Sequence, residues 1–569
     1  MRLYHLALLS LISLILSYSL VFAAPLNSTK ENPVILQAFD WYLPDPGSKD
    51  EIPESNLWKF IAQKGADQFK NDYFTHIWLP PVSKAFSSDS SYNVGYAVYD
   101  RYDLGEFDQM GRIRTKYGLK KELIDAVKVM HKNDLKVIGD IVMNHQLGGG
   151  IPSNVDYDYG FKVYPDGSVK SLGAGQIQAW LTFDFANKGD RNPRKTEYSS
   201  FVWKPEHFTG IETFGAYYLL RGKQVGKESI FNDLSQLPEK DAEMYKKVRS
   251  RIILGAQLDH LQPDVQRELL TWTKWFINEI GLDGFRVDAI RHMDIPFISM
   301  WGREIADYMK VIGKDKDMLM FGENWDGWAE RLNSYLLGSP SNNVLSYSEG
   351  MGPQNYAGIN KAMGLFDVPL HYDFQKISHT NNSYPPTRMI DLPSRGLLAK
   401  SPKYTVTFVD NHDTIPTQQL ESYILANTKI QAYAFILLHQ NGIPCVFYRD
   451  LYQGNFVSPY QNDQKDYFYK NISALLELRQ THAYGEGQFF MNNNKPGVLG
   501  YKRMGDSNHN GSGLIYLIRE PNNGDNGLNI PVDSREWKLV LGNGSYKNGT
   551  FYLENSNFAV WVPNLTKKK

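Results

Sequence analysis

Eight short apolar segments between residues 34 and 447 set the strongest limit on the fold, because amphipathic stretches separate several of them. The stretch Lys120–Lys132 is one example, since its apolar residues recur at the spacing of a helix. Alternating strands and helices indicate a parallel sheet, and eight such units predict an α/β fold, a closed (β/α)8 barrel. The strand candidates are 34–39, 76–81, 135–142, 284–288, 318–323, 364–370, 404–410 and 443–447.

The spacing between these segments locates an insertion. Asp288 and Glu323 end neighbouring strand candidates and are 35 residues apart, which suits one strand-helix unit, whereas 148 residues separate Asp140 from Asp288. We therefore expect an extra lobe after the third strand, beside the strand ends. After about residue 488, short alternating runs predict an antiparallel C-terminal β domain. The predicted division is a signal peptide (1–23), a barrel (24–145 and 257–487), an inserted lobe (146–256) and the C-terminal domain (488–569).

The first 23 residues have the pattern of a secretory signal peptide. Arg2 precedes an apolar run from Leu6 to Phe22, and the small residues Ala23 and Ala24 follow it. An uncleaved membrane anchor is the alternative, but several serines interrupt the run. We therefore predict a protein that is secreted, or held in a lumen of the secretory path, without stable membrane association.

Seven N-x-S/T glycosylation acceptors fit export through a secretory path, and they predict a glycoprotein unless the source is bacterial. These acceptors are Asn27, Asn381, Asn471, Asn510, Asn543, Asn548 and Asn564.

The charge balance excludes the classes of partner that need a strong surplus. With 61 basic and 62 acidic residues, the formal net charge is -1, which argues against nucleic acid or an anionic membrane and suits an uncharged substrate. Cys445 is the only cysteine, so no intrachain disulfide forms, and its apolar surroundings indicate a packed thiol. We expect a monomer.

Four of the strand candidates carry the same kind of ending, in which apolar residues lead into carboxylates, amides or imidazoles. Parallel strands of a barrel deliver their carboxyl ends to one shared site. The pattern therefore predicts that these side chains meet. The four stretches are Asp140–His145, Gly284–Asp288, Phe321–Trp325 and Phe408–Asp413.

Two carboxylates in these stretches suit the cleavage of a glycosidic bond, which needs an acid on one face and a carboxylate on the other. Arg286 and Asp288 are two apart and point the same way on a strand, so we expect Arg286 to lower the pKa of Asp288. Glu323 follows an apolar strand and precedes Trp325, a setting that can raise a carboxyl pKa. The alternative is an ordinary buried Arg-Asp pair.

Taken together, the four stretches resemble the signature regions of the alpha-amylase family of glycoside hydrolases, in the same order. The likeness extends from Val34 to about Tyr484 and is closest to the bacterial liquefying type. The segments that carry this closer likeness are Gln37–Tyr42, Val94–Asp100, Tyr102–Phe107 and Phe366–Tyr372.

The resemblance implies roles for three carboxylates. Asp288 matches the nucleophile, Glu323 the general acid/base, and Asp413 the acid that binds and distorts the sugar at the cleavage point. It also implies a set of substrate contacts, with Arg286 positioning the nucleophile and structural ion pairing as the alternative role for Arg291. These contacts are Tyr96 stacking under a sugar ring, His145 and His412 at its hydroxyls, Arg291 and His292 on the leaving-group side, and Trp325.

A calcium site between lobe and barrel is also implied by the resemblance, with Asn144 and the carbonyl of His292 among its ligands. At two positions where close relatives carry aspartate, this chain has Thr209 and Gln257. Calcium affinity depends strongly on the number of charged ligands, so we expect calcium to bind weakly or not at all.

The resulting prediction is a secreted alpha-amylase that cleaves internal alpha-1,4 bonds of starch or glycogen with retention of configuration. One alternative is another activity on the same scaffold, an alpha-glucosidase or a glucanotransferase. The other is an inactive homologue associated with an amino-acid transporter, which the presence of all three acids opposes.

Overall fold

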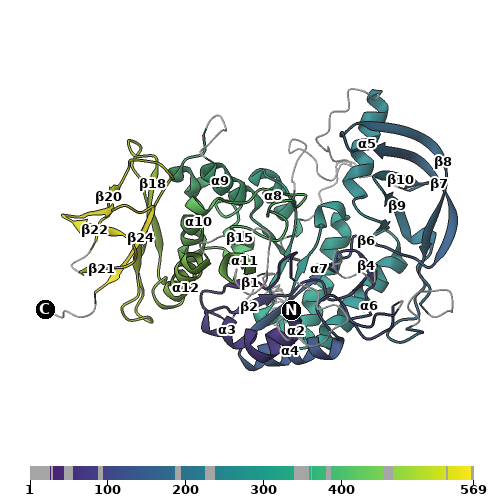
Figure 1. Cartoon of the computed structure of the whole chain (residues 1–569), viewed down its shortest axis with the longest axis horizontal. Helices are drawn as coiled ribbons and strands as arrows, with labels where there is room; N and C mark the ends of the chain where they lie inside the picture. Colours follow the sequence, from purple (N-terminus) through teal and green to yellow (C-terminus); the bar gives the residue numbers. More distant parts are fainter. Residues whose placement is uncertain are drawn as a thin grey trace, which may run out of the picture.

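The structure is a computed structural model, and eight parallel strands form a closed barrel at its centre (Figure 1). It describes residues 26, 28, 30–43, 56–86, 94–109, 111–185, 194–223, 238–338, 358–359, 362–379, 386–452, 465–532 and 536–564. The order around the barrel is β1-β16-β15-β14-β13-β12-β5-β2, which confirms the predicted fold. The strands are β1 (Ile35–Gln37), β2 (His76–Trp78), β5 (Lys136–Ile141), β12 (Gly284–Val287), β13 (Met320–Gly322), β14 (Gly364–Phe366), β15 (Thr405–Phe408) and β16 (Ile443–Phe447).

The fourteenth strand shows why some strands are shorter than predicted. The segment 364–370 is apolar except for Asp367, yet β14 ends at Phe366 and helix α9 (Val368–Ser378) follows at once. Asp367 causes the change, because its side chain accepts a hydrogen bond from the backbone N–H of Leu370 at 3.2 Å and so caps the helix.

Helices cover the outside of the barrel with their apolar faces turned inward. In α4 (Lys120–Lys132), for example, Leu123, Val127 and Met130 lie on one buried face. Within the described part of the chain, no helix is both long and apolar enough to cross a membrane, and the predicted signal peptide lies outside that part. The other principal helices of this layer are α2 (Leu57–Phe60), α3 (Ala66–Asn71), α6 (Pro263–Ile280), α7 (Ile295–Val311), α8 (Ala329–Leu337), α10 (Ala426–Leu438), α11 (Tyr448–Tyr452) and α12 (Lys465–Thr481).

Aromatic side chains fill the inside of the barrel. Trp78 from β2 lies 5.6 Å from Phe366 of β14 between ring centroids, and Phe366 lies 5.0 Å from Phe321 and 5.3 Å from Phe408. Edge-on and tilted contacts of this kind are favourable and leave no channel. The barrel is therefore a solid core, and polar chemistry is confined to its carboxyl end.

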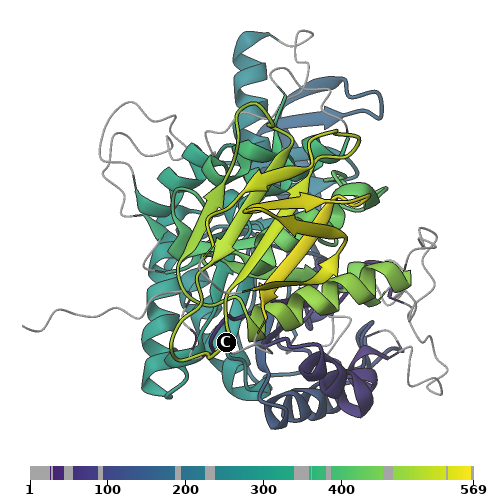
Figure 2. The same cartoon turned by 90° about the vertical axis from the view of Figure 1, so that its left-hand side faces the viewer.

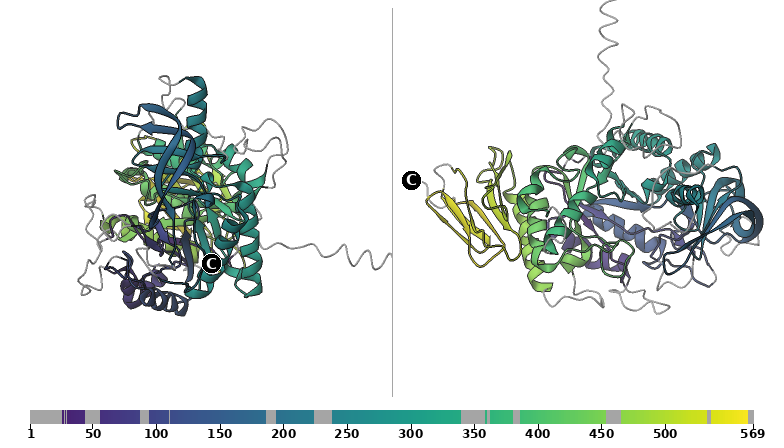
Figure 3. Two further views of the ribbon diagram at one scale, coloured as in Figure 1. Left: turned by 90° about the vertical axis from the view of Figure 1, so that its right-hand side faces the viewer. Right: turned by 90° about the horizontal axis from the view of Figure 1, so that it is seen from above.

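A six-stranded sheet and helix α5 (Glu239–Arg251) form a lobe at one end of the molecule (Figure 3). Its first strand follows β5 after only three residues, and its last strand pairs back onto the first, with Gln257 opposite His145. The lobe sheet is thereby joined to the carboxyl end of the barrel strands. Its strands, in spatial order, are β6 (His145–Gln146), β11 (Ala256–Leu258), β9 (Phe208–Thr213), β10 (Ala216–Leu220), β7 (Ile151–Val163) and β8 (Val169–Thr182).

The C-terminal part of the chain forms antiparallel sheets at the opposite end from the lobe (Figures 1 and 2). Glu520 at the end of β19 accepts a hydrogen bond from Arg388 at 2.8 Å and so ties these sheets to the barrel. One sheet contains β17 (Gly487–Phe490), β18 (Val498–Arg503), β19 (Leu514–Arg519), β24 (Phe558–Pro563) and β21 (Trp537–Gly542); the other contains β20 (Gly527–Asn529), β23 (Thr550–Leu553) and β22 (Gly544–Lys547).

Candidate active site

A cavity of about 720 Å³ lies where the carboxyl ends of the barrel strands face the lobe. Its volume is in the range of sites that hold small organic ligands. Its walls include most of the residues that the sequence predicts to act on substrate. Those in the lining are Tyr96, His145, Asp288, Arg291, His292, Glu323, Trp325, His412 and Asp413, and Arg286 lies beneath them.

One guanidinium group organises the floor of this cavity. Arg286 is buried, and its Nη1 donates to Asp288 at 2.8 Å and to Asp140 at 2.9 Å, while its Nη2 donates to Glu323 at 2.7 Å. The planar fork of arginine suits several carboxylates at once. The structure therefore brings together the two carboxylates that the sequence predicts to perform catalysis.

The backbone around β12 explains how these groups meet. A Cβ on Gly284 would lie 2.2 Å from the carbonyl oxygen of Leu319, so only glycine allows this approach of β12 to the neighbouring chain. After Asp288 the chain turns through Ala289, whose φ of 50° is unusual for a residue with a side chain. This turn aims the N–H of Ala289 at Glu323, at 3.1 Å.

The predicted pKa of Asp288 is wrong in its direction. Burial raises the pKa of Asp288 well above its usual range; Arg286 lowers it, and the negative charges of Glu323, Asp140 and Asp413 raise it further. One guanidinium cannot offset burial together with so many acids. Asp288 is thus part of a cluster of carboxyls that holds protons more tightly than separate carboxyls would.

Asp413 belongs to the same cluster and lies on its open side. Its side chain is 22% exposed, and burial followed by the negative charge of Glu323 raises its pKa to about 7. His412 lies beside it, with Nε2 at 3.4 Å from Asp413. The side-chain amide of Gln37 lies 2.8 Å from Nδ1 of His412, and if it donates there, the Nε2–H of His412 faces the cleft.

The imidazole of His412 is neutral, because burial and then the charge of Arg286 lower its pKa well below the usual value. Its ring stacks on Tyr96, with centroids 5.3 Å apart and planes 8° from parallel. The hydroxyl of Tyr96 donates to Asp140 at 2.7 Å. His412 and Tyr96 therefore form a fixed, uncharged surface beside the carboxylates.

The structure places His145 in the lining but directs its ring nitrogens toward protein groups. Nε2 lies 2.8 Å from the carbonyl oxygen of Tyr96, and Nδ1 lies 3.3 Å from the side-chain nitrogen of Asn144. Burial lowers the pKa of His145 to about 4, so it is neutral. The described contacts give this histidine a role in holding Tyr96 in place.

One wall of the cavity is formed by residues that follow β12 and β13. Arg291 donates to the carbonyl oxygen of Trp325 at 2.7 Å, and the indole N–H of Trp325 donates to the hydroxyl of Tyr372 at 2.8 Å. His292 lies 2.8 Å from the carbonyl oxygen of Ser250 through Nδ1, and burial lowers its pKa to about 3. These contacts hold the wall in place through one edge of each ring, at Nδ1 of His292 and at the indole N–H of Trp325.

Sequence reasoning assigned no role to two residues that the site depends on. Asp140 is buried and accepts from Trp78 at 3.1 Å as well as from Tyr96 and Arg286, and Gln37 orients His412. Both stand in strands whose side chains alternate between the barrel interior and the helix layer. A carboxylate in an otherwise apolar strand is the feature of the sequence that could have revealed Asp140.

Comparison with known proteins decides the family. The chain is 33% identical to an alpha-amylase of Bacillus licheniformis, covering 99% of both chains, and 32% identical to an alpha-amylase of Geobacillus stearothermophilus, covering 96% of this chain and 88% of that one. The chain belongs to the alpha-amylase family. It is therefore a glycoside hydrolase.

Three further comparisons give a more distant relative, a related family and the same fold. A cytoplasmic alpha-amylase of Escherichia coli (strain K12) is 29% identical over 93% of this chain and 99% of that one. The model of Glycosyl hydrolase family 70 matches residues 55–149. The crystal structure of an alpha-amylase from Geobacillus thermoleovorans in complex with acarbose has a TM-score of 0.54 and 17% identity, covering 94% of this chain and 99% of that one, and it supports the fold.

Alpha-amylases generally bind calcium, but the residues at the corresponding place here do not fit the ion. Gln257 is buried on β11, and its Nε2 donates to Oδ1 of Asn144 at 2.7 Å and to the carbonyl oxygen of His292 at 3.4 Å. Thr209 contributes a hydroxyl that donates to the carbonyl of Gln257 at 3.4 Å. All these groups are neutral, and calcium prefers sites that include carboxylates.

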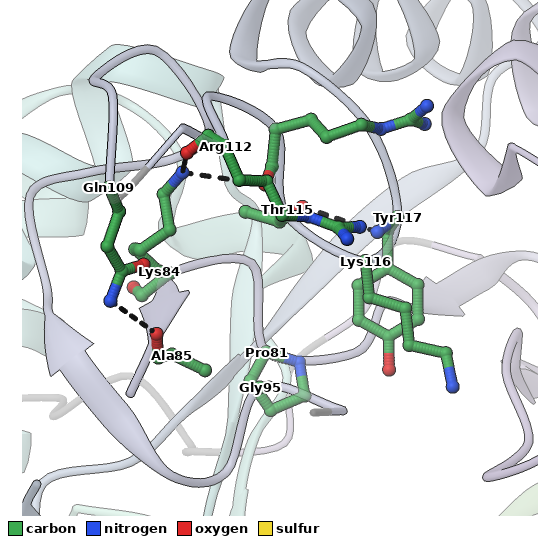
Figure 4. A pocket seen from close by; sticks show the side chains of 11 residues that line it. Pro81, Lys84, Ala85, Gly95, Gln109, Arg112, Thr115, Lys116 and Tyr117 are labelled. Carbon is green, nitrogen blue, oxygen red and sulfur yellow. Dashed lines mark hydrogen bonds between the residues drawn. The ribbon is translucent and has the colours of Figure 1, made fainter. Parts of the chain in front are cut away.

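A second cavity, of about 20 Å³, lies behind the β3 (Lys84–Ala85) and β4 (Val98–Asp100) hairpin (Figure 4). The ammonium group of Lys84 donates there to the carbonyl oxygens of Phe107 at 3.3 Å and Arg112 at 3.2 Å. Its buried charge is also 3.7 Å from Asp103. These contacts hold the backbone at Phe107 and Arg112 against β3, which is a structural role.

Proposed function

We propose that this alpha-amylase family member cleaves internal alpha-1,4 bonds of starch or glycogen with retention of configuration. The observation that carries the proposal is the bridge formed by Arg286 between Asp288 and Glu323. Two carboxylates held by one guanidinium fork suit the short separation of retaining enzymes, about 5–5.5 Å, better than the wider gap of inverting ones.

In the first step Glu323 donates its proton to the glycosidic oxygen while Asp288 attacks the anomeric carbon. The bond to the leaving chain breaks, and an ester forms between the sugar and Asp288. In the second step the carboxylate of Glu323 takes a proton from a water molecule. The water oxygen attacks the anomeric carbon, the ester bond breaks, and Asp288 is released as a carboxylate. Two inversions give net retention.

The carboxyl cluster links the charges of the nucleophile and the general acid. Asp288 and Glu323 both bind the guanidinium of Arg286, so a negative charge on Glu323 opposes ionisation of Asp288. The first step, in which Glu323 gives up a proton while Asp288 attacks, avoids that repulsion.

Asp413 and its neighbours are suited to hold the sugar at the cleavage point. A carboxylate that accepts hydrogen bonds from ring hydroxyls can favour a distorted sugar, because those bonds strengthen in the transition state. The Nε2–H of His412 points to the same place, and Tyr96 offers a flat ring for stacking. His145 supports Tyr96 beneath this sugar, and Arg291, His292 and Trp325 contact the leaving chain.

Calcium binds weakly or not at all at the junction of lobe and barrel. Gln257 already satisfies Asn144 with an amide proton, and the nearby carboxylate of Asp259 accepts from the ammonium of Lys223 at 2.9 Å. The oxygen of Asn144 thus already binds the amide of Gln257, and the carboxylate of Asp259 already binds the ammonium of Lys223. These are the oxygens that would otherwise attract a calcium ion. Asp190 and Asp233, other acids of the lobe, lie outside the described residues.

The parts of the chain suit a protein that is exported and that binds a polymer in an open cleft. Residues 1–23 act as a signal peptide, 146–256 as the lobe that walls the cleft, and 488–569 as a cap on the barrel of a secreted monomer without membrane association. The exposure of Asn510, Asn543 and Asn548 supports glycosylation there. Asn471 is a poor acceptor, because it is buried on α12 and donates to the carbonyl of Tyr467 at 2.7 Å.

The chain-length distribution of products from soluble starch, followed over time, tests this proposal. An endo-acting hydrolase releases a range of oligosaccharides early, while the iodine-staining polymer disappears quickly. Release of glucose alone would point to an alpha-glucosidase, and products longer than an added oligosaccharide would point to a glucanotransferase.

A further inference from the structure

Trp328 stands at the rim of the cleft with more than half of its surface uncovered. Its side chain lines the cavity and is 57% exposed, although tryptophan is among the most buried residue types on average. It precedes α8, so its ring is not needed to fill the space between that helix and the barrel. A packing role therefore does not explain it.

The ring is nevertheless held in a fixed position. Asp326 is buried, and its Oδ1 accepts from the backbone N–H of Trp328 at 2.8 Å, while its Oδ2 lies 3.1 Å from Nε of Arg331. The guanidinium of Arg331 in turn lies over the Trp328 ring, 4.4 Å from its centroid. One buried carboxylate thus sets both the backbone under the indole and the cation against its face.

This arrangement leaves the indole free to bind on the side that Arg331 does not cover. A fixed aromatic ring in a wet cleft pairs well with a group that has an apolar face and polar edges, because the face stacks while the edges stay hydrated. A glucosyl ring has this character. The indole carries no charge that would bind an ion. Its wet surroundings also do not suit an extended apolar ligand.

The position of Trp328 relative to the carboxylates assigns it to one end of the cleft. Trp325, three residues earlier, accepts at its carbonyl from Arg291 and donates its indole N–H to Tyr372. Arg291, Trp325, Tyr372 and Trp328 therefore form one continuous wall of the cavity. This wall lies on the side proposed for the leaving chain.

We propose that Trp328 is the platform of an additional glucosyl-binding subsite on the leaving-group side of the cleft. The inference rests on the proposed alpha-glucan hydrolysis and extends it. A chain long enough to reach Trp328 gains affinity that a shorter chain lacks. Trp328 consequently biases where a long chain is cut and how well an acceptor chain is held.

Two substrates separate this role from a general effect on catalysis. Maltotriosyl fluoride has fluoride as its leaving group and so places no sugar on the leaving-group side, whereas maltoheptaose spans the cleavage point. We expect Trp328→Ala to lower kcat/KM for maltoheptaose by about tenfold and to change that for the fluoride far less. The products of maltoheptaose should also shift in length, and Trp328→Phe should recover part of both effects.

Trp180 on β8 offers a matched control, because it is 51% exposed and lies outside the lining of the cleft. Trp180→Ala should leave the ratio of kcat/KM for the two substrates at the wild-type value. Equal losses of Trp328→Ala on both substrates, or an unchanged ratio and product pattern, would overturn the subsite. If the wild-type protein hydrolysed neither substrate, the proposed function itself would fail.

Discussion

The side-chain amide of Gln257 donates to the side-chain oxygen of Asn144 at 2.7 Å, across the junction between the lobe sheet and the barrel. Both residues are buried, and the same amide nitrogen lies 3.4 Å from the carbonyl oxygen of His292. A hydrogen-bond donor thus links oxygens that the family resemblance assigns to a calcium ion. These hydrogen bonds join lobe and barrel directly, through side-chain and backbone groups of the protein.

Chelation should therefore change the stability of this protein very little. A ligand stabilises a folded protein only in proportion to its binding, so a weak site contributes little at micromolar calcium. We expect EDTA to shift Tm by no more than about a degree or two and to leave starch hydrolysis intact. A large drop that added calcium reverses would show that lobe acids such as Asp184, or acids outside the described residues, complete a site.

Gln257→Ala provides the complementary measurement. It removes the donor from two buried oxygens, and leaving such groups unsatisfied costs about 1–3 kcal/mol each at most. We expect a clear fall in Tm that calcium does not restore. Thr209→Ala is the matched control, because its hydroxyl makes only a 3.4 Å contact in the same place, and it should cost much less.

Replacing Glu323 by Gln should affect substrates in proportion to their need for an acid. Starch should lose several powers of ten in turnover, whereas a glycosyl fluoride, whose leaving group needs little protonation, should lose much less in its first step. Equal losses on both would contradict the role of Glu323 as general acid.

The same variant should move the acid limb of the pH profile. Burial is the largest cause of the raised pKa values of Asp288 and Asp413, and the negative charge of Glu323 adds to both. A neutral Gln removes that addition, so both pKa values fall. With the fluoride as substrate, the acid limb should shift to lower pH; a shift to higher pH would contradict the described cluster.

Asp413→Asn tests how the raised pKa of Asp413 affects the stability of the folded protein. The pKa of Asp413 is about 7 in the folded protein, against about 3.9 for an unperturbed aspartate. The folded state therefore holds more protons between these values, and the stability contributed by this group falls as pH rises from about 4 to 7. We expect the Tm of the variant relative to wild type to increase between pH 5 and pH 8. A pH-independent difference would mean that Asp413 titrates normally.

The barrel and the meeting of the carboxylates follow from the order of the sequence. Each strand of a barrel delivers its end to the same face, so the segments ending in Asp288, Glu323 and Asp413 had to converge. The strand ends were harder to predict. Asp367, for instance, stops β14 by capping α9, whereas the apolar residues on both sides of it favour one longer strand.

The pKa of Asp288 could not be predicted without its three-dimensional surroundings. From the sequence, Arg286 has one acidic neighbour, Asp288, and a lowered pKa follows. In the structure the guanidinium also contacts Asp140 and Glu323, which arrive from other strands, and burial outweighs its charge. Arg449 is a second example, because its partner Asp40, at 3.6 Å, comes from the first barrel unit, about 400 residues earlier in the chain.

Replacing Asp288 by Asn should abolish turnover while preserving the fold. The amide has the size of the carboxylate and keeps an oxygen toward Arg286, so Tm should change little. Without a nucleophile no ester forms, and kcat should fall by several powers of ten. Retention of more than about a tenth of wild-type turnover would mean that another group attacks the sugar.

The most direct test of the account is to trap the sugar on the protein. The Glu323→Gln variant, incubated with maltotriosyl fluoride and denatured during turnover, should accumulate the ester, because water is no longer activated for the second step. Mass spectrometry of its peptides should then find one maltotriosyl group, attached to Asp288. A label on a different carboxylate, or products of inverted configuration with no label, would contradict the assignment of Asp288 as the nucleophile of a retaining enzyme.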